Sequence, residues 1–208
     1  MTSVLGLDFD GTLVGCRRRQ LSALAEVARA EEAAFDDSAL REFWEFKLEG
    51  ASTREALLLL GHDDVWATRV AAAWVSVVEQ ERFLMLDELL PGTVKTLDEL
   101  SSRGYVPRVL TARTHPDRAL RQVDRLLADH VDSTHVVSPR AAPEGKGRWL
   151  KAWSAAAFVG DTEADASAAR AEGIPFYAVC SGQRSQKYLL AWGLRVFADL
   201  EEVARALP

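Results

Sequence analysis

The pattern of apolar positions divides the chain into a short strand, a long helical block and a region in which strands and helices alternate. Val4, Leu5 and Leu7 form an apolar run that is too short for an amphipathic helix and is followed by a Gly-Thr turn signal. From about residue 20 to residue 83 the apolar residues keep helical spacing, with no strand candidate. The sequence therefore predicts a buried first strand followed by an all-helical insertion of roughly 70 residues.

Turn and capping residues divide this insertion into separate helices. Apolar residues from Leu21 to Ala28 mark the first helix, and Gly50 ends the second. Ser52 and Glu55 match a capping box that begins a third helix, and Asp64 is expected to cap a longer fourth one. We expect the large aromatic residues of the block to pack in its core rather than form a stacking surface; these are Trp44, Trp66 and Trp74.

Strands and helices alternate from residue 91 onward. The predicted strands cover residues 106–111, 135–138, 156–160 and 176–179, and the predicted helices cover 93–102, 116–129 and 163–172. Strands separated by helices imply right-handed, parallel βαβ units in a doubly wound sheet. We therefore predict an α/β core domain of residues 1–15 and 89–208 and an all-helical domain of residues 16–88, with hinges at Gly15–Cys16 and Asp87–Gly92.

The composition is that of a globular protein. Of the 208 residues, 48% are hydrophobic and 27% are charged, and the formal net charge is −6. This acidic balance argues against nucleic acid as a partner, because proteins that bind phosphate backbones usually present a basic face. The sequence shows no signal-peptide pattern and no apolar stretch of bilayer length, and Cys16 and Cys180 have neither metal-binding nor redox spacing. We expect a cytoplasmic protein with reduced thiols and no membrane contact, and the oligomeric state is left open.

Two carboxylates follow the first predicted strand. Asp8 and Asp10 are two residues apart, so on a strand they project from the same side. Like charges placed together repel each other unless one is protonated or a cation lies between them. A hard divalent metal is therefore the favoured interpretation, with a surface turn built from Asp and Gly as the alternative.

Further polar residues lie at the ends of the other predicted strands, where ligands bind in such sheets. The set suits phosphoryl transfer, because a carboxylate can attack phosphorus while hydroxyl, N–H and ammonium groups hold its oxygens and further carboxylates retain Mg²⁺. Single members also have structural alternatives, such as helix capping for Asp165 and a solvated loop for Lys146. The set comprises Asp8 and Asp10, Thr111, Lys146 on the loop before the fourth strand, and Asp161 and Asp165.

In these residues the chain resembles the haloacid dehalogenase (HAD) superfamily. The segment Asp8-Phe9-Asp10-Gly11-Thr12 matches the first motif, and Gly160-Asp161-Thr162-Glu163-Ala164-Asp165 matches the fourth; together these two are specific. Thr111 and Lys146 match the second and third motifs, which are single residues. The resemblance covers the whole core in the right order. It implies a HAD-like Rossmannoid sheet in which the helical insertion is a small α-helical cap.

The resemblance implies a role for each matched residue. Asp8 would be the nucleophile that forms an aspartyl-phosphate, and Asp10 would act as general acid and then as base while its backbone carbonyl contacts Mg²⁺. Thr111 would hydrogen-bond the phosphoryl group, and Lys146 would neutralise it and orient Asp8. The implied magnesium site comprises Asp8, Asp10, Asp161 as a direct ligand and Asp165 in a supporting position.

Three positions depart from the family pattern, although none removes a catalytic group. Gly15-Cys16 stands where many relatives carry Asp-Ser, Ala112-Arg113 stands in place of the common Asn, and Gly147 replaces Pro. The segment Arg17-Arg18-Arg19 is interpreted as a solvated linker before the first helix, with contact to a substrate anion as the alternative. The candidate substrate contacts are Gly11, Lys47, Arg54, Ala112, Arg113 and His115.

Taken together, these residues predict a Mg²⁺-dependent phosphatase that hydrolyses a small phosphomonoester through an aspartyl-phosphate on Asp8. Two alternatives stay open. The segment Leu48-Glu49-Gly50-Ala51-Ser52 loosely resembles the cap loop of phosphomutases that act on sugar phosphates. A phosphate-sensing module that has lost turnover would keep the same fold.

Overall fold

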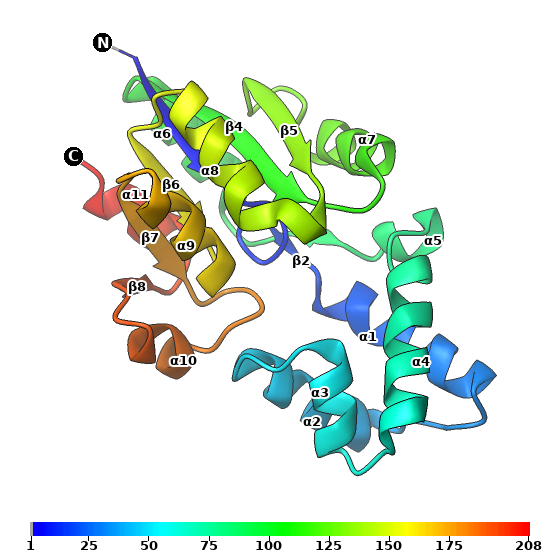
Figure 1. Cartoon of the computed structure of the whole chain (residues 1–208). Coiled ribbons are helices and arrows are strands. Elements are labelled where there is room, and N and C mark those ends of the chain that lie inside the picture. The colour runs from blue at the N-terminus through cyan, green and yellow to red at the C-terminus, as the bar shows by residue number, and fades with distance from the viewer. Residues whose placement is uncertain (1) are drawn as a thin grey trace.

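Strand β1 (Ser3–Leu7) lies inside a parallel sheet, and the first candidate site residues follow its carboxyl end (Figure 1). The computed structural model describes residues 2–208, so Met1 of the predicted core domain lies outside the described residues. Within that range, six strands pair in parallel throughout. In sheet order they are β5 (Ser133–Val137), β4 (Tyr105–Ala112), β1, β6 (Ala157–Gly160), β7 (Phe176–Val179) and β8 (Val196–Phe197).

Successive apolar side chains of the strands point to opposite faces of the sheet, so both faces are apolar. Helices cover both of them. The helices are α6 (Thr93–Ser102), α7 (Pro116–Leu127), α8 (Ala142–Ala152), α9 (Glu163–Ala171), α10 (Gln186–Ala191) and α11 (Leu200–Ala206). Leu5 and Val109 belong to a core shared with α6, α7 and α11. Leu110 and Phe158, on the other face, pack in a second core with α8 and α9. The predicted α/β fold class with a doubly wound parallel sheet is confirmed.

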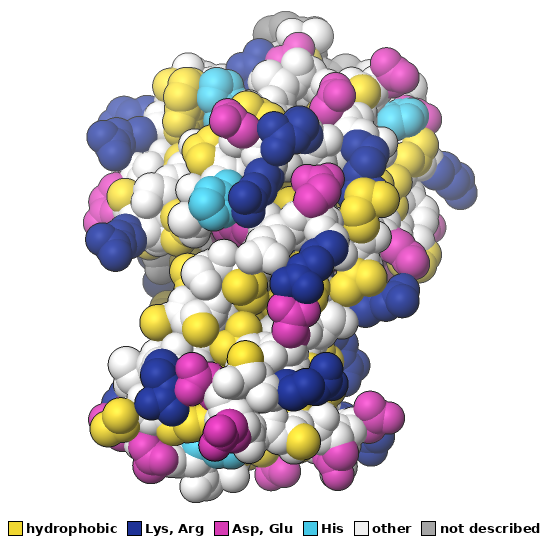
Figure 2. Space-filling model, turned by 90° about the vertical axis from the view of Figure 1, so that its right-hand side faces the viewer, with side chains coloured by type: hydrophobic (Ala, Val, Ile, Leu, Met, Phe, Trp, Pro, Cys, Tyr) yellow, Lys and Arg dark blue, Asp and Glu magenta, His cyan; other side chains and the backbone are white. Residues whose placement is uncertain are grey.

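A block of helices is inserted between β2 (Val14–Gly15) and β3 (Glu88–Leu89), which pair as an antiparallel ribbon. The inserted helices are α1 (Arg17–Ala30), α2 (Asp37–Leu48), α3 (Thr53–Leu59), α4 (Asp64–Val77) and α5 (Glu81–Leu84). We call residues 17–84 the helical lobe and the rest the α/β lobe. The two are joined by a narrower waist in Figure 2. No helix within residues 2–208 is long and apolar enough to cross a membrane.

The helical lobe has its own apolar core, separate from the two cores of the α/β lobe. Leu24, Phe43 and Leu57 are buried there, from three different helices. Trp44 is buried, and Trp66 and Trp74 pack against this core. The division of the chain into two domains at the predicted boundaries stays a prediction.

Several element boundaries differ from those expected. Helix α1 begins at Arg17, so the arginine run is helical rather than a linker. Asp63, not Asp64, caps α4, because its side chain accepts the N–H of Trp66. The sequence pattern does not predict strand β8, because a run of two residues is too short to indicate a strand.

Lys146 lies within helix α8, and its expected place on a loop is wrong. The expectation came from the glycines on either side, which have low helix propensity. Close packing explains why a glycine is used here: a Cβ at Gly147 would come within 3.2 Å of the backbone oxygen of Ala168 on α9. Tertiary contact between α8 and α9 therefore overrides local propensity and fixes Lys146 on a rigid element.

Leu5→Ala is predicted to lower the free energy of unfolding by about 2–5 kcal/mol, because truncating a fully buried leucine leaves a cavity. Urea denaturation followed by circular dichroism measures the change. The matched control is Leu190→Ala on α10, where the leucine is 54% exposed and the expected change is below about 0.5 kcal/mol. Equal effects of the two substitutions would contradict the place of Leu5 in the core.

Candidate active site

The loop that follows β1 runs against the loop that follows β6. The N–H of Asp8 donates to the carbonyl oxygen of Val159 (2.8 Å), which extends the contact between the strands. Gly11 has a φ of +81°, and a Cβ at this position would come within 2.2 Å of the Oδ2 atom of Asp161. Glycine is therefore required at position 11, and it lets the two acidic loops approach each other.

Lys146 connects two of the predicted site carboxylates. Its Nζ donates to Oδ1 of Asp8 and to Oδ1 of Asp165, each at 2.6 Å, and all three side chains are buried. Although burial alone would lower the pKa of Lys146, Asp165 and Asp8 raise it above its ordinary value. Thr162 caps α9 and also donates to Oδ2 of Asp165 (2.5 Å), so Asp165 is held from both sides. The site therefore contains a fixed ammonium group against the candidate nucleophile.

Asp8, Asp161 and Asp165 bring carboxylate oxygens within 4.8 Å of one another. Burial raises the pKa of Asp8 to about 7, with Lys146 opposing the rise and Asp165 adding to it. Burial and the charges of Asp8 and Asp165 raise the pKa of Asp161 well above its ordinary value. Among the described residues, Oδ1 of Asp161 has no hydrogen-bond partner, whereas Oδ2 accepts the N–H of Gln183 (2.6 Å). Buried carboxylates with an unpaired oxygen are a donor set that a hard divalent cation fits.

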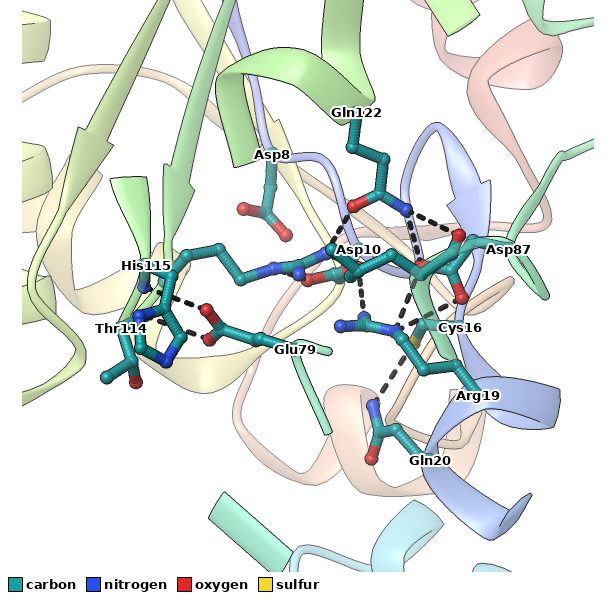
Figure 3. Close-up of polar contacts among 12 residues, drawn as sticks. Asp8, Asp10, Cys16, Arg19, Gln20, Glu79, Asp87, Thr114, His115 and Gln122 are labelled. Atoms are coloured by element: carbon teal, nitrogen blue, oxygen red, sulfur yellow. Dashed lines mark hydrogen bonds and ion pairs between the residues drawn. The ribbon is translucent and has the colours of Figure 1, made fainter. Parts of the chain in front are cut away.

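Two buried arginines hold the Asp10 carboxylate, and Figure 3 labels one of them, Arg19. Arg113, which follows β4, donates from Nε to Oδ2 (2.6 Å) and from Nη2 to Oδ1 (2.7 Å). Arg19, on α1 of the helical lobe, donates from Nη2 to Oδ1 (2.6 Å). Burial would raise the pKa of Asp10, but Arg113 and Arg19 outweigh it and lower the pKa below its ordinary value. Asp10 is thus a charged carboxylate at the junction of the two lobes.

Asp87 extends this network of charges (Figure 3). Nε of Arg19 donates to Oδ1 of Asp87 (3.1 Å), and Nε2 of Gln122 donates to Oδ2 (2.8 Å). Burial raises the pKa of Asp87 to about 6, against the lowering effect of Arg19. The interpretation of the arginine run as a solvated linker is therefore wrong for Arg19, because its guanidinium group is buried and is paired with the carboxylates of Asp10 and Asp87.

The remaining predicted substrate contacts lie in different places. Lys47 is buried where α2 meets the α/β lobe, and burial together with the charge of Arg184 lowers its pKa to about 8. Arg54 lies on the exposed surface of the helical lobe and pairs with Asp64, away from the carboxylate cluster. His115 is the N-cap residue of α7. Their predicted roles in substrate binding stay predictions.

Two adjoining cavities lie against the site. The first measures about 120 Å³ and the second about 220 Å³. Since a water molecule in the liquid takes up about 30 Å³, the first has room for a group of a few non-hydrogen atoms. The first is lined by Asp8, Asp10, Thr111, Ala112, Lys146 and Asp165, among others. The second lies beside Asp10 and is lined by residues of both lobes, including Arg19, Trp74 and Arg113.

Four further residues belong to this site although no sequence motif marks them: Gln20, Glu79, Asp87 and Gln183. A signal for Gln183 was available, since it follows β7 at the same sheet edge as the other site residues. Glu79 and Asp87 lie near the end of the helical insertion, where acidic residues usually face solvent. Their contacts come from the packing of the two lobes, which residue spacing does not describe.

Solved structures share this fold over nearly the whole chain. A haloacid dehalogenase-like family hydrolase from Streptococcus pneumoniae is 21% identical, with a TM-score of 0.76 over 99% of this chain and 98% of that one. A predicted phosphoglycolate phosphatase from Haemophilus somnus is 17% identical, with a TM-score of 0.72 over 99% and 97%. A candidate β-phosphoglucomutase from Thermotoga maritima is 22% identical, with a TM-score of 0.65 over 99% and 98%. At these identities the similarity shows the fold.

Comparison of the sequence with protein families adds the assignment that fold similarity alone does not give. No curated protein matches the sequence significantly. The profile of the haloacid dehalogenase-like hydrolases matches residues 2–173, which include the strand-end carboxylates, Thr111 and Lys146. The chain therefore belongs to the haloacid dehalogenase-like hydrolase family.

Proposed function

We propose that this hydrolase is a Mg²⁺-dependent phosphatase that releases phosphate from a small phosphomonoester through an aspartyl-phosphate on Asp8. The observation that carries the proposal is the 2.6 Å contact between Lys146 and Asp8, beside an acidic cluster and a small cavity. A nucleophile, a fixed positive charge and carboxylates that fit a divalent cation all border one space. That combination is suited to phosphoryl transfer rather than to binding alone.

The proposed reaction has two half-reactions. In the first, a carboxylate oxygen of Asp8 attacks phosphorus, the bond from phosphorus to the alcohol oxygen breaks, and Asp10 gives that oxygen a proton. In the second, water attacks the aspartyl-phosphate, transfers a proton to Asp10 and releases inorganic phosphate, which regenerates Asp8. Lys146 orients Asp8 and offsets the charge of the phosphoryl oxygens throughout.

Asp10 must gain and lose a proton in this cycle. Arg19 and Arg113 favour its charged form, which is the form that accepts a proton from water in the second half-reaction. For the first half-reaction, substrate binding has to loosen at least one of these contacts so that Asp10 can carry a proton. Loosening of the contact from Arg19 would couple the reaction to the position of α1.

When bound, Mg²⁺ would supply positive charge that offsets the phosphoryl oxygens. The proposed ligands are Asp8, Asp161 and the backbone carbonyl of Asp10. Asp165, held by Lys146 and Thr162, would support them. Two observations support this assignment: Oδ1 of Asp161 has no partner among the described residues, and the pKa values of Asp8 and Asp161 are raised. A bound cation would accept the free oxygen as a ligand and would stabilise the charged form of both carboxylates.

A phosphomutase acting on a sugar phosphate is the second candidate. It is favoured by the resemblance of the segment from Leu48 to Ser52 to a mutase cap loop and by the contact of that segment with the α/β lobe, where the N–H of Ser185 donates to the carbonyl oxygen of Leu48 (2.8 Å). Phosphate release from a sugar bisphosphate separates the candidates. Steady release over many turnovers supports the phosphatase, whereas a burst followed by return of the phosphoryl group to the sugar supports the mutase.

Asp8→Asn is predicted to reduce phosphate release from an aryl phosphate by at least about 10³-fold, because the amide cannot form the acyl-phosphate bond. A colorimetric phosphate assay with Mg²⁺ measures the rate, and circular dichroism checks that the fold is retained. The control, Asp124→Asn, changes an exposed aspartate on α7 and should leave the rate unchanged. Full activity of Asp8→Asn would rule out Asp8 as the nucleophile.

Mg²⁺ is predicted to raise the Tm, and to raise it more at pH 8 than at pH 5.5. A ligand at ten times its Kd stabilises a protein by about 1.4 kcal/mol, which corresponds to about 3–5 °C for a chain of this size. The pH dependence arises because the pKa of Asp8 is raised from 3.8 to about 7, so protons compete with the metal at low pH. Without Mg²⁺, the same raised pKa means that stability is lost as the pH rises through about 7.

Differential scanning fluorimetry measures both effects. In Asp161→Asn the Mg²⁺-dependent increase in Tm should disappear, whereas in Asp124→Asn it should persist. An increase that is the same at both pH values, or that survives in Asp161→Asn, would contradict the assigned cation site.

A further inference from the structure

A closed ring of side chains links Asp10 to a second aspartate. Arg19 donates to both aspartates, from Nη2 to Oδ1 of Asp10 (2.6 Å) and from Nε to Oδ1 of Asp87 (3.1 Å). On the other side of the ring, Nε2 of Gln122 donates to Oδ2 of Asp87 (2.8 Å), and Oε1 of Gln122 accepts from Nη2 of Arg113 (3.2 Å). Nη2 of Arg113 also donates to Oδ1 of Asp10 (2.7 Å), which completes the ring. Figure 3 labels four of the members, Asp10, Arg19, Asp87 and Gln122.

Asp87 lies too deep to touch a substrate. Its side chain is 0% exposed, and it lines neither of the two cavities beside Asp10. It stands between α5 and β3, where the helical lobe joins the α/β lobe. Its two oxygens accept from Arg19 and from Gln122. Any effect of Asp87 on the reaction must therefore pass through the two arginines that hold Asp10.

The charges of the ring balance, because two carboxylates face two guanidinium groups. This balance matters because the proposed reaction requires Asp10 to give up at least one of its arginine contacts. If Arg19 releases Asp10, it still has the carboxylate of Asp87 as a partner. Without Asp87, the same release would leave a guanidinium group that is only 4% exposed with no opposite charge beside it, which is costly. Asp87 therefore makes it easier for Arg19 to release Asp10.

The inference rests on the proposed phosphatase reaction, in which Asp10 gives its proton to the alcohol oxygen as the bond from phosphorus to that oxygen breaks. We propose that Asp87 is a positioning residue for this proton transfer. It retains Arg19 when the contact from Arg19 to Asp10 loosens, and through Gln122 it keeps Arg113 in place, so that the Asp10 carboxyl stays beside the smaller cavity. Asp87 therefore matters most for substrates whose alcohol oxygen needs a proton in order to leave.

The test compares two substrates whose leaving groups differ in their need for a proton. The alkoxide of benzyl alcohol is a strong base and needs a proton to leave, whereas 2,4-dinitrophenolate is a weak base and leaves without one. The value of kcat/KM is measured with Mg²⁺, because it covers only the steps up to departure of the leaving group.

In Asp87→Asn we expect kcat/KM for benzyl phosphate to fall about 10- to 100-fold, which is part of what a general acid contributes. The value for 2,4-dinitrophenyl phosphate should fall by less than about threefold. A merely structural role would lower both values by the same factor. Equal losses for the two substrates, or no loss for either, would therefore overturn the proposal.

A second variant tests the route through Gln122 and serves if Asp87→Asn does not fold. Gln122→Met has a similar volume but removes the link from Asp87 to Arg113. It should lower kcat/KM for benzyl phosphate selectively, by about three- to tenfold, because Arg19 keeps its contact with Asp87. The matched control is Asp124→Asn, an exposed aspartate on α7, in which neither value should change. Equal losses for both substrates in Gln122→Met would overturn the proposed route to Arg113.

The variant Asp10→Asn distinguishes a failure of this inference from a failure of the phosphatase assignment. Its loss for benzyl phosphate should be selective and at least as large as that in Asp87→Asn, because the group that gives the proton is itself replaced. Absence of hydrolysis of both compounds by the unsubstituted protein would contradict the proposed function. A selective loss in Asp10→Asn without one in Asp87→Asn would leave the proposed function standing and would contradict the role of Asp87.

Discussion

Four aspartates gathered at one edge of the sheet, three of them buried and Asp10 partly buried, impose the constraint on which the rest of the structure depends. Each buried carboxylate loses hydration worth several kcal/mol unless hydrogen bonds or opposite charges replace it. The protein supplies these partners unequally: one ammonium serves two carboxylates, two guanidinium groups serve a third, and one backbone N–H serves the fourth. The carboxylates are Asp8 and Asp165 with Lys146, Asp10 with Arg19 and Arg113, and Asp161 with Gln183. Asp161 has no positively charged partner among the described residues, and this lack of a counter-charge is the physical argument for a cation.

The positively charged side chains at the site come from different parts of the molecule. Lys146 comes from α8, which packs directly on α9, so its distance to Asp8 is fixed within the α/β lobe. Arg19 comes from α1 and reaches Asp10 across the junction of the lobes. A shift of the helical lobe would therefore leave Asp8 paired with Lys146 but change the partners of Asp10. In the proposed reaction Asp10 transfers the protons, so the environment of that group depends on the position of the other lobe.

Much of the fold could be predicted because it follows from local patterns. Short apolar runs mark the strands, and strand-end carboxylates with Gly11 mark the sheet edge at which ligands bind in such folds. The helical position of Lys146 could not be predicted, since glycine lowers helix propensity and only packing against α9 explains it. Likewise, a run of three arginines contains no sign that Arg19 alone is buried. Its partner Asp87 is 68 residues away, and only tertiary structure brings the two together.

The junction between the lobes is polar, in contrast to the apolar cores on either side. The backbone of Lys47 and Leu48 accepts hydrogen bonds from Arg184 and Ser185, and Arg19 reaches Asp10. Water can replace such partners at a net cost of about 0.5–1.5 kcal/mol for each neutral hydrogen bond and more for charged ones, whereas exposing an apolar core would cost far more. The lobes can therefore separate without unfolding either one. The smaller cavity is lined by the α/β lobe alone, whereas the larger one is lined by both lobes, so a movement of the helical lobe would change access to the larger cavity.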